Sequence, residues 1–165
     1  MAVEIDLKFR DTVTHFDVAQ VREIVTSTGF FNKEEIAVAV ELVDERLQKG
    51  LKSDYYFIFV EMKNKTVGYT CFGPIPATKA SYDLYWIAVH DKCRGMGIGK
   101  RLIQQTEAAI KKMGGSRIYI ETSSREQYEP TRAFYLACNY ILEATLQDFY
   151  APDDSKCIYV KSIES

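Results

Sequence analysis

The pattern of apolar and polar positions changes its period several times along the first half of the chain. Every second residue is apolar over 3–10, which predicts a strand with one buried face. Apolar residues then recur at helical spacing over 16–28, and again from Asn32 to about Gly50. Asn32 with Glu35 three positions later is typical of a capping box, so we expect the second helix to begin there.

The middle of the chain is rich in aromatic and β-branched residues, which favour strands. The pattern predicts a hairpin of 55–62 and 66–72 with a short polar turn between the two strands. Pro74 and Pro76 are too close together for regular structure, so they are expected to end the second strand. A further apolar strand is expected over 82–89.

The second half of the chain alternates between helical and strand periods. A pair of glycines at 114–115 breaks the chain after one helix, and Pro130 is suited to the first turn of the next. The expected elements are helix, strand, helix, strand and strand, over 100–113, 117–122, 130–138, 140–149 and 156–163. The whole order is therefore β-α-α-β-β-β-α-β-α-β-β. With no repeat and no linker, it indicates a single α/β domain over 1–165.

Composition narrows the class of protein. At 165 residues, with 47% hydrophobic and 27% charged residues, the chain is expected to fold as one soluble globular domain. The net charge is −2 and the basic residues are scattered apart from one loop, which disfavours a nucleic-acid-binding protein. No apolar run approaches the ~20 residues of a membrane span, and no leader-like segment opens the chain. The default expectation is a cytoplasmic protein without membrane association.

The cysteines and histidines show no spacing typical of a metal site or a catalytic site. The four cysteines lie in unrelated elements without CxxC spacing, so we expect reduced and mostly packed thiols. His15 and His90 are isolated from each other and from other ligand types. We therefore expect neither a metal site nor a catalytic triad.

A basic loop with three glycines stands between the strand 82–89 and the helix after it. Glycines at 95, 97 and 99 remove side chains that would keep an anion from the backbone, and they allow positive φ angles. The helix that follows adds free amides and the positive end of its dipole. Four cations surround the same point: Lys92, Arg94, Lys100 and Arg101. These features together predict a phosphate site.

The spacing of these residues selects among phosphate ligands. The Walker pattern fails because Arg101 replaces its Ser or Thr, and the dinucleotide fingerprint fails because Lys100 stands at its third glycine. Arg94-x-x-Gly97-x-Gly99 instead resembles the Gln/Arg-x-x-Gly-x-Gly/Ala signature of the GCN5-related N-acetyltransferases (GNAT), which binds acetyl-CoA. The alternative is a glycine-rich turn without a ligand.

A second segment extends the resemblance over nearly the whole chain. Residues 130–140 resemble the family's Ala-x-x-(Phe/Leu)-Tyr-x-x-x-Gly-(Phe/Tyr) segment, with Asn139 in place of the glycine. Asn tolerates the left-handed conformation that this position needs. Many relatives have Ser-Asn where this chain has Ser123-Ser124, which puts any role of that Asn in holding CoA in doubt.

The resemblance implies a GNAT-like acyl-CoA N-acyltransferase fold, a mixed central sheet of about seven strands flanked by about four helices. It implies that the strands 84–89 and 117–122 separate at one end and that the pantetheine arm lies between them like an added strand. A backbone N–H near Val89 would polarise the thioester carbonyl. The implied cofactor-binding residues are Ile87, Ala88, Val89, Arg94, Gly95, Met96, Gly97, Ile98, Gly99 and Lys100.

The resemblance also implies catalytic roles. Tyr135 matches the tyrosine that protonates the CoA thiolate, although it could be a packed core residue instead. The acceptor ammonium must lose a proton, and Glu121 and Asp83 stand where relatives carry a base. We prefer Glu121, which belongs at the open end of the two strands. Either carboxylate could be structural, and a chain of waters could replace both. The amine attacks directly, without a covalent enzyme intermediate.

The acceptor site is the least determined part. Phe31, Tyr128 and Tyr150 could line it, together with Phe30 and Phe149, but such aromatics are more often core residues. The turn after Tyr150 is acidic and similar to the tyrosine-rich turn of N-terminal acetyltransferases, which suits a cationic acceptor with a free α-amine. A small-molecule amine and a protein N-terminus both remain open.

Two other classes of function remain beside the enzyme. The first is a non-catalytic acyl-CoA sensor, which would bind CoA without turnover; the retained Tyr135 disfavours it. The second is an interaction domain with a vestigial cofactor site, which the intact three-glycine loop disfavours more strongly. A two-fold homodimer is the default expectation for the assembly.

Overall fold

The computed structural model describes residues 5–163 and contains the predicted elements in the predicted order. The helices of this described part are α1 Phe16–Ser27, α2 Lys33–Lys49, α3 Ile98–Lys112 and α4 Glu129–Ala137. The strands are β1 Leu7–Arg10, β2 Tyr56–Met62, β3 Lys65–Pro74, β4 Ser81–Val89, β5 Arg117–Ser123, β6 Ile141–Ala151 and β7 Asp154–Ser162. Short 3₁₀ turns lie at Gly50–Ser53, Asp91–Cys93 and Glu126–Tyr128.

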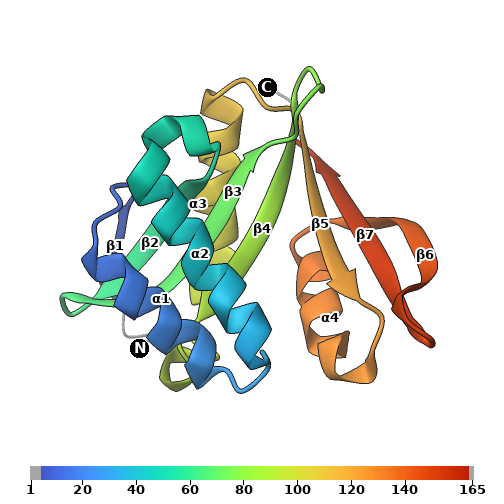
Figure 1. Ribbon diagram of the computed structural model, residues 1–165, viewed down its shortest axis with the longest axis horizontal. Helices are drawn as coiled ribbons and strands as arrows, with labels where there is room; N and C mark the ends of the chain where they lie inside the picture. Colours follow the sequence, from blue (N-terminus) through green and yellow to red (C-terminus); the bar gives the residue numbers. More distant parts are fainter. Residues whose placement is uncertain (1–4, 164–165) are drawn as a thin grey trace. The chain divides into compact units, whose positions relative to one another are not determined.

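The strands form one mixed sheet of seven, in the order β1-β2-β3-β4-β5-β7-β6 (Figure 1). Strand β4 pairs with β5 in parallel, whereas β1–β2, β2–β3, β5–β7 and β6–β7 are antiparallel. A mixed sheet of seven strands with four helices is the expected architecture, and the prediction of fold class is confirmed.

By their internal packing the residues divide into two compact units. One unit contains the residues up to Gly73 together with Trp86–Thr106, and the other contains Pro74–Tyr85 together with Glu107 onwards. Strand β4 and helix α3 each contribute residues to both units.

In the first unit, helices cover both faces of the strands. α1 and α2 cover one face, where Val21 and Val43 belong to a buried cluster with Phe57, Tyr69 and Ala88 (Figure 1). α3 lies on the other face, where a Cβ added to Gly68 would lie 3.2 Å from Leu102 Cδ1. Because Gly68 has no side chain, the helix that follows the glycine loop packs close to β3.

In the second unit, α4 packs against one face of the strands through β7 and the end of β5. Tyr135 of α4 contacts Tyr159 of β7 with 5.9 Å between ring centroids. On the same face Tyr140 Oη donates to Glu107 Oε2 at 2.9 Å, and Lys161 Nζ donates to Glu107 Oε1 at 3.0 Å. The carboxylate of Glu107 is satisfied on both oxygens, so this is a structural network.

Local sequence signals explain most element boundaries. The capping box at Asn32 is present in both directions, with Glu35 N donating to Asn32 Oδ1 at 2.8 Å and Asn32 N to Glu35 Oε1 at 3.2 Å. Asn139 has a φ of 70°, the left-handed conformation expected at that position.

Several predicted boundaries are wrong. Strand β6 continues to Ala151 and β7 begins at Asp154, so the last hairpin is longer than the predicted strands over 140–149 and 156–163. The first strand is expected over 3–10, but it begins at Leu7, which pairs with Met62, the last residue of β2; Val3 lies outside the described residues.

Strand β3 continues through Pro74, because a proline without an N–H is tolerated at a strand end. Helix α3 begins at Ile98, two residues before the predicted start at Lys100. The side chain of Ile98 is 1% exposed, and its burial stabilises the first turn of the helix.

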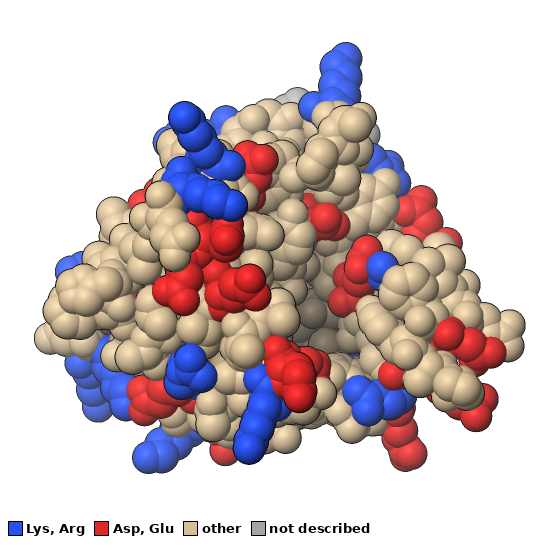
Figure 2. Space-filling model, viewed as in Figure 1, with Lys and Arg blue, Asp and Glu red and all other residues tan. Residues whose placement is uncertain are grey.

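Acidic and basic side chains are interspersed over the face of the molecule that Figure 2 shows. None of the helices within residues 5–163 is long and apolar enough to cross a membrane.

One buried hydrogen bond ties α3 to β3, and it gives a test of the packing behind the glycine loop. Thr106 Oγ1 donates to Leu102 O at 2.8 Å, so Thr70 Oγ1 must donate the 2.7 Å bond between the two hydroxyls. Both threonines are at most 1% exposed. Thr106→Val is expected to lower the free energy of unfolding by about 1–3 kcal/mol, because the Thr70 hydroxyl is left without an acceptor.

The double variant Thr70→Val/Thr106→Val removes both hydroxyls and is the matched control. It should regain most of the loss in a urea unfolding experiment, since no buried donor is then unpaired. A double variant as unstable as the single one would show that shape, not hydrogen bonding, governs this contact.

Candidate functional site

The glycine loop is held at its start by backbone and hydroxyl contacts of the first unit. His90 N donates to Val67 O at 2.7 Å, where β4 ends, and Asp91 N donates to Ser27 Oγ at 3.0 Å from the end of α1. A short 3₁₀ turn follows, closed by Cys93 N donating to His90 O at 2.8 Å. The loop therefore leaves the strand in a fixed direction.

The loop itself has the backbone conformation of an anion site. Gly95 and Gly97 both have a φ of 75°, and a Cβ added to either would meet no heavy atom within 4 Å. Glycine is required here by backbone conformation and not by lack of space. Ile98, Gly99 and Lys100 open α3, and their amides have no partner within the helix because no turn precedes them. The first turn of α3 carries no acidic residue that would repel an anion.

Side chains around the loop are largely available to a ligand. The Arg94 side chain is 57% exposed, and its Nη1 lies 3.4 Å from Asp91 Oδ1, a loose and solvent-screened pair. Met96 is 37% exposed. The guanidinium of Arg94 also lies 5.8 Å from the ring centroid of Phe30, which limits the directions it can take.

The β4 residues before the loop face in two directions. Ala88 is 6% exposed and packs in the cluster beneath α1 and α2, so only its backbone is available to a ligand. Ile87 and Val89 are half-buried and point to the opposite face. The predicted cofactor residues, at the end of β4 and in the loop after it, thus all belong to the first unit.

The two candidate bases lie in the second unit, on one face of its strands. Pairing of β4 with β5 covers only Ser81–Asp83, and Asp83 is opposite Tyr119 at the last paired position. Glu121 is two residues further along β5 and shares the face of Tyr119. Leu84 and Tyr85 lie beyond the pairing, so β4 and β5 begin to separate beside Asp83.

A lysine on the same face is ion-paired with one of the two carboxylates, Glu121. Glu121 is opposite Ile158 in β7, and Lys156 is two residues before Ile158. Lys156 Nζ lies 2.8 Å from Glu121 Oε2, with side-chain exposures of 15% for the lysine and 47% for the glutamate. Sequence reasoning missed Lys156, because only the β5–β7 register brings it to the carboxylates.

The titration of Asp83 is strongly perturbed. Burial, followed by the negative charge of Glu121, raises the pKa of Asp83 from 3.8 to about 6, while Lys156 opposes the rise. Asp83 is half-buried, and no donor within residues 5–163 makes a hydrogen bond to its carboxylate. A carboxylate with a pKa near neutrality and no fixed partner is suited to accept a proton.

Tyr135 lies on the opposite face of the same strands. Its neighbour Tyr159 is opposite Ile120, and Ile120 points away from Glu121 because adjacent residues of a strand alternate. Burial raises the pKa of Tyr135 above its usual range, followed in effect by Cys138 and Tyr159, so the phenol stays protonated. The phenol of Tyr135 and the carboxylates of Asp83 and Glu121 therefore occupy opposite faces.

The three predicted acceptor residues belong to different units: Phe31 to the first, and Tyr128 and Tyr150 to the second. Tyr150 is 48% exposed, and burial and then the charges of Glu121 and Asp154 raise its pKa. Tyr128 contributes to the same shift, so Tyr128, Tyr150 and Glu121 lie near one another. Phe31 belongs to the first unit and packs against the buried cluster there, with 4.7 Å between its ring centroid and that of Trp86.

The Ser-Ser sequence that replaces the family's Ser-Asn has a structural use. Ser124 N donates to Ser155 O at 2.9 Å, and Ser155 N donates to Ser124 Oγ at 2.8 Å. Arg132 Nη1 donates to Ser123 O at 2.7 Å and thereby joins α4, which carries Tyr135, to the end of β5. Sequence reasoning missed Arg132, because its partners are backbone carbonyls.

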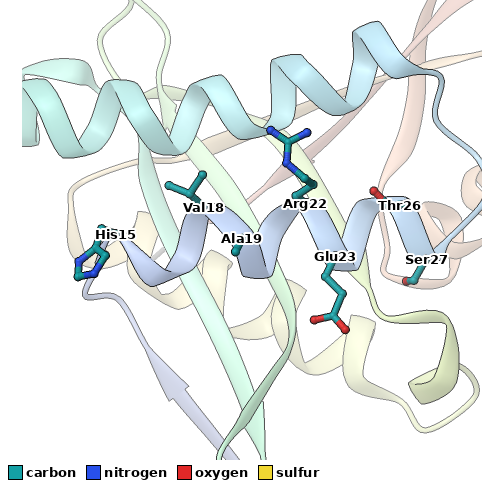
Figure 3. A pocket seen from close by; sticks show the side chains of 7 residues that line it. All are labelled: His15, Val18, Ala19, Arg22, Glu23, Thr26 and Ser27. Atoms are coloured by element: carbon teal, nitrogen blue, oxygen red, sulfur yellow. The ribbon is translucent and has the colours of Figure 1, made fainter.

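A separate concavity of about 760 Å³ lies along α1 and contains none of the predicted site residues. Its lining side chains come from α1 and from His15, the N-cap residue of that helix, and Figure 3 shows Arg22 and Glu23 pointing to opposite sides of the helix. Within residues 5–163 no group of three or more His, Cys, Asp or Glu is arranged to hold a metal ion.

Comparison with known proteins agrees with the sequence resemblance. The profile of the acetyltransferase (GNAT) family matches residues 19–140. A protein from Desulfovibrio desulfuricans assigned to the GNAT acetyltransferases is 41% identical, with a TM-score of 0.95 over 96% of this chain and 100% of that one. A search of curated proteins gives no match.

More distant solved structures share the fold. An aminoglycoside 6′-N-acetyltransferase complexed with coenzyme A is 17% identical, with a TM-score of 0.76 over 96% of this chain and 98% of its own. The ribosomal-protein-S18-alanine N-acetyltransferase of Escherichia coli is 14% identical, with a TM-score of 0.76 over 97% and 96%. The chain belongs to the acetyltransferase (GNAT) family, and it is an acyltransferase.

Proposed function

We propose that this protein is an N-acetyltransferase that transfers the acetyl group of acetyl-CoA directly to a primary amine within a ternary complex. The observation that carries the proposal is the loop from Arg94 to Lys100. It places two glycines at a φ of 75° before the open amino end of α3, in a chain of the acetyltransferase family. Glycines of this kind leave backbone amides accessible to a pyrophosphate.

The loop is suited to hold CoA by its phosphates. Amides of α3 and the cations Arg94 and Lys100 would each supply a charge-assisted hydrogen bond, worth roughly 1.5–3 kcal/mol before ordering costs. Ile87 and Val89 would pair with the pantetheine arm through their backbone groups, as in strand addition. The amide near Val89 would polarise the thioester carbonyl.

An amine acceptor is supported by the names of the structural neighbours. One neighbour is an aminoglycoside 6′-N-acetyltransferase and another is a ribosomal-protein-S18-alanine N-acetyltransferase. These acceptors share an amine nitrogen and little else. The class that we propose for this chain is therefore a primary amine, either a small molecule or the α-amine of an amino acid or peptide.

The reaction needs two proton transfers. An alkylammonium with a pKa of about 10.4 is protonated at neutral pH and must first give a proton to a base. The free amine then attacks the thioester carbon, the C–N bond forms, and the C–S bond breaks. The nitrogen loses its second proton as the thiolate gains one, so the products are the amide, CoA thiol and one proton released to solvent.

This chain has side chains suited to both transfers. Tyr135 is buried and protonated, so it is suited to donate to the thiolate. Asp83 and Glu121 are the candidate bases on the other face of the strands. Placement of acid and base on opposite faces matches a reaction in which the amine arrives on one side of the thioester and the thiol leaves on the other.

Binding of the donor is tested by replacing Gly97. Acetyl-CoA at ~100 times its dissociation constant should stabilise the wild-type protein by about 2.7 kcal/mol in a thermal unfolding experiment, whereas NADP should not. Gly97→Val should abolish this shift, because a β-branched residue cannot adopt a φ of 75° and the loop must rearrange.

Gly50→Val is the matched control. Gly50 also has a positive φ, 60°, and a Cβ added to it would meet no heavy atom within 4 Å, but it lies at the end of α2 and outside the loop from Arg94 to Lys100. It should lose stability but keep the shift caused by acetyl-CoA. Retention of the shift in Gly97→Val would refute the phosphate site.

The acid is tested by Tyr135→Phe. A thiol with a pKa of about 8.5 is a fair leaving group even without help, so we expect kcat to fall about tenfold to a hundredfold rather than more. The acetyl-CoA-induced thermal shift should be unchanged, because the phenylalanine fills the same space. Thiol release in the presence of a panel of primary amines measures turnover, and undiminished kcat would make Tyr135 a packing residue.

A further inference from the structure

Three charged side chains from three strands share one face of the second unit: Asp83 of β4, Glu121 of β5 and Lys156 of β7. Only two of them are paired. Lys156 Nζ lies 2.8 Å from Glu121 Oε2, whereas no group within residues 5–163 makes a hydrogen bond or ion pair to the carboxylate of Asp83. The cluster therefore holds one satisfied and one unsatisfied carboxylate.

We propose that Lys156 is a positioning residue that gives the two carboxylates different roles: its ion pair occupies Glu121 and leaves Asp83 to take the proton of the acceptor ammonium. The proposal rests on the acetyltransferase function proposed above. It reverses the preference for Glu121 that sequence position favoured.

Lys156 is held firmly enough for such a role. Its Nζ lies 4.3 Å from the ring centroid of Phe149 of β6 as well as beside Glu121. The lysine side chain is only 15% exposed, so solvent screens the ion pair less than at the surface. A cation between an aromatic face and a carboxylate has few alternative positions.

The electrostatic effect on Asp83 has a definite sign. Two carboxylates close together disfavour double ionisation, so each raises the pKa of the other. Lys156 opposes this effect and lowers the pKa of Asp83, while burial and Glu121 raise it. The balance leaves Asp83 ionised at neutral pH yet basic enough to accept a proton.

Other titratable groups around the cluster are already engaged. Asp154 of β7 is 3.3 Å from Arg125 Nε and hydrogen-bonds the Ser123 hydroxyl. Tyr119, opposite Asp83, accepts from Arg117 Nε at 3.1 Å. Tyr150 of β6 lies near Glu121, and burial and then the charge of Glu121 raise its pKa, so its phenol is neutral near pH 7.

Charge balance follows from these pairs. Lys156 compensates Glu121 and Arg125 compensates Asp154, so Asp83 is the uncompensated carboxylate of this described cluster. The single positive charge of an acceptor ammonium would balance the single uncompensated negative charge of Asp83. The proton passes from that ammonium to a carboxylate oxygen of Asp83, giving a neutral amine and a carboxylic acid that later releases the proton to solvent.

Two measurements test the proposal, one of which needs no activity. The first follows the carboxyl carbon of Asp83 by NMR titration in the free protein, and the second is the acid limb of kcat/KM, which reports the free enzyme. Lys156→Met should move both midpoints to higher pH and Glu121→Gln should move both to lower pH, each by roughly half a pH unit to one pH unit. Lys156→Arg, which keeps the charge, should restore both.

Lys161→Met is the matched control. Lys161 lies on the same strand and is also ion-paired, 3.0 Å from Glu107, but on the face of Ile118, away from Asp83. It should lose stability without moving either midpoint. The double variant Glu121→Gln/Lys156→Met removes both charges and should return near the wild-type midpoints.

The inference is overturned if the NMR midpoint of Asp83 is the same in Lys156→Met and wild type. It is equally overturned if the acid limb disappears in Glu121→Gln and survives in Asp83→Asn, since Glu121 would then be the base. If the NMR midpoint shifts as expected but no amine supports thiol release, the acetyltransferase proposal fails, while the electrostatic coupling of the three residues stands.

Discussion

Alternation of side chains along the paired strands is the constraint on which the chemistry of the second unit depends. Once Glu121 is opposite Ile158, Lys156 must share its face and Tyr159 must point to the other. Tyr135 then packs on the Tyr159 side, away from the carboxylates. A shift of this register by one residue would move Lys156 to the face of Tyr135 and leave Glu121 unpaired.

In the first unit, the proposed CoA-binding loop would bind mainly through its backbone amides. The loop after β4 needs positive φ angles, and glycine supplies them at 95 and 97. The rigid parts lie on either side of it. Val67 accepts from the amide of His90 at one end, and Thr70 bonds Thr106 of α3 beyond the other. The glycine-rich loop is thus anchored by hydrogen bonds on both sides, which reduces the entropy that it would lose on binding an anion.

The site carries a cost in stability. Asp83 is half-buried without a hydrogen bond, and burial raises its pKa from 3.8 to about 6. The folded state therefore binds its proton more tightly than the unfolded state, so this group favours folding below pH 3.8, and its contribution is lost as pH rises through about 6. By contrast, Glu107 on the opposite face has partners on both oxygens and serves packing alone. The lack of partners at Asp83 is consistent with its proposed role as the base, since groups with strongly perturbed pKa values are common at functional sites.

The sequence by itself determined the element order, the capping box at Asn32, the glycine loop and the left-handed Asn139, because each depends on the conformational preferences of a few neighbouring residues. Motif spacing likewise predicted the family, which the comparisons confirm. The roles of Tyr135, Asp83 and Glu121 remain predictions. Only the tertiary structure decided that Lys156 pairs with Glu121, that Asp83 stands alone, and that Tyr135 lies on the other face. Those facts depend on the register between strands far apart in sequence, and no local pattern encodes a register.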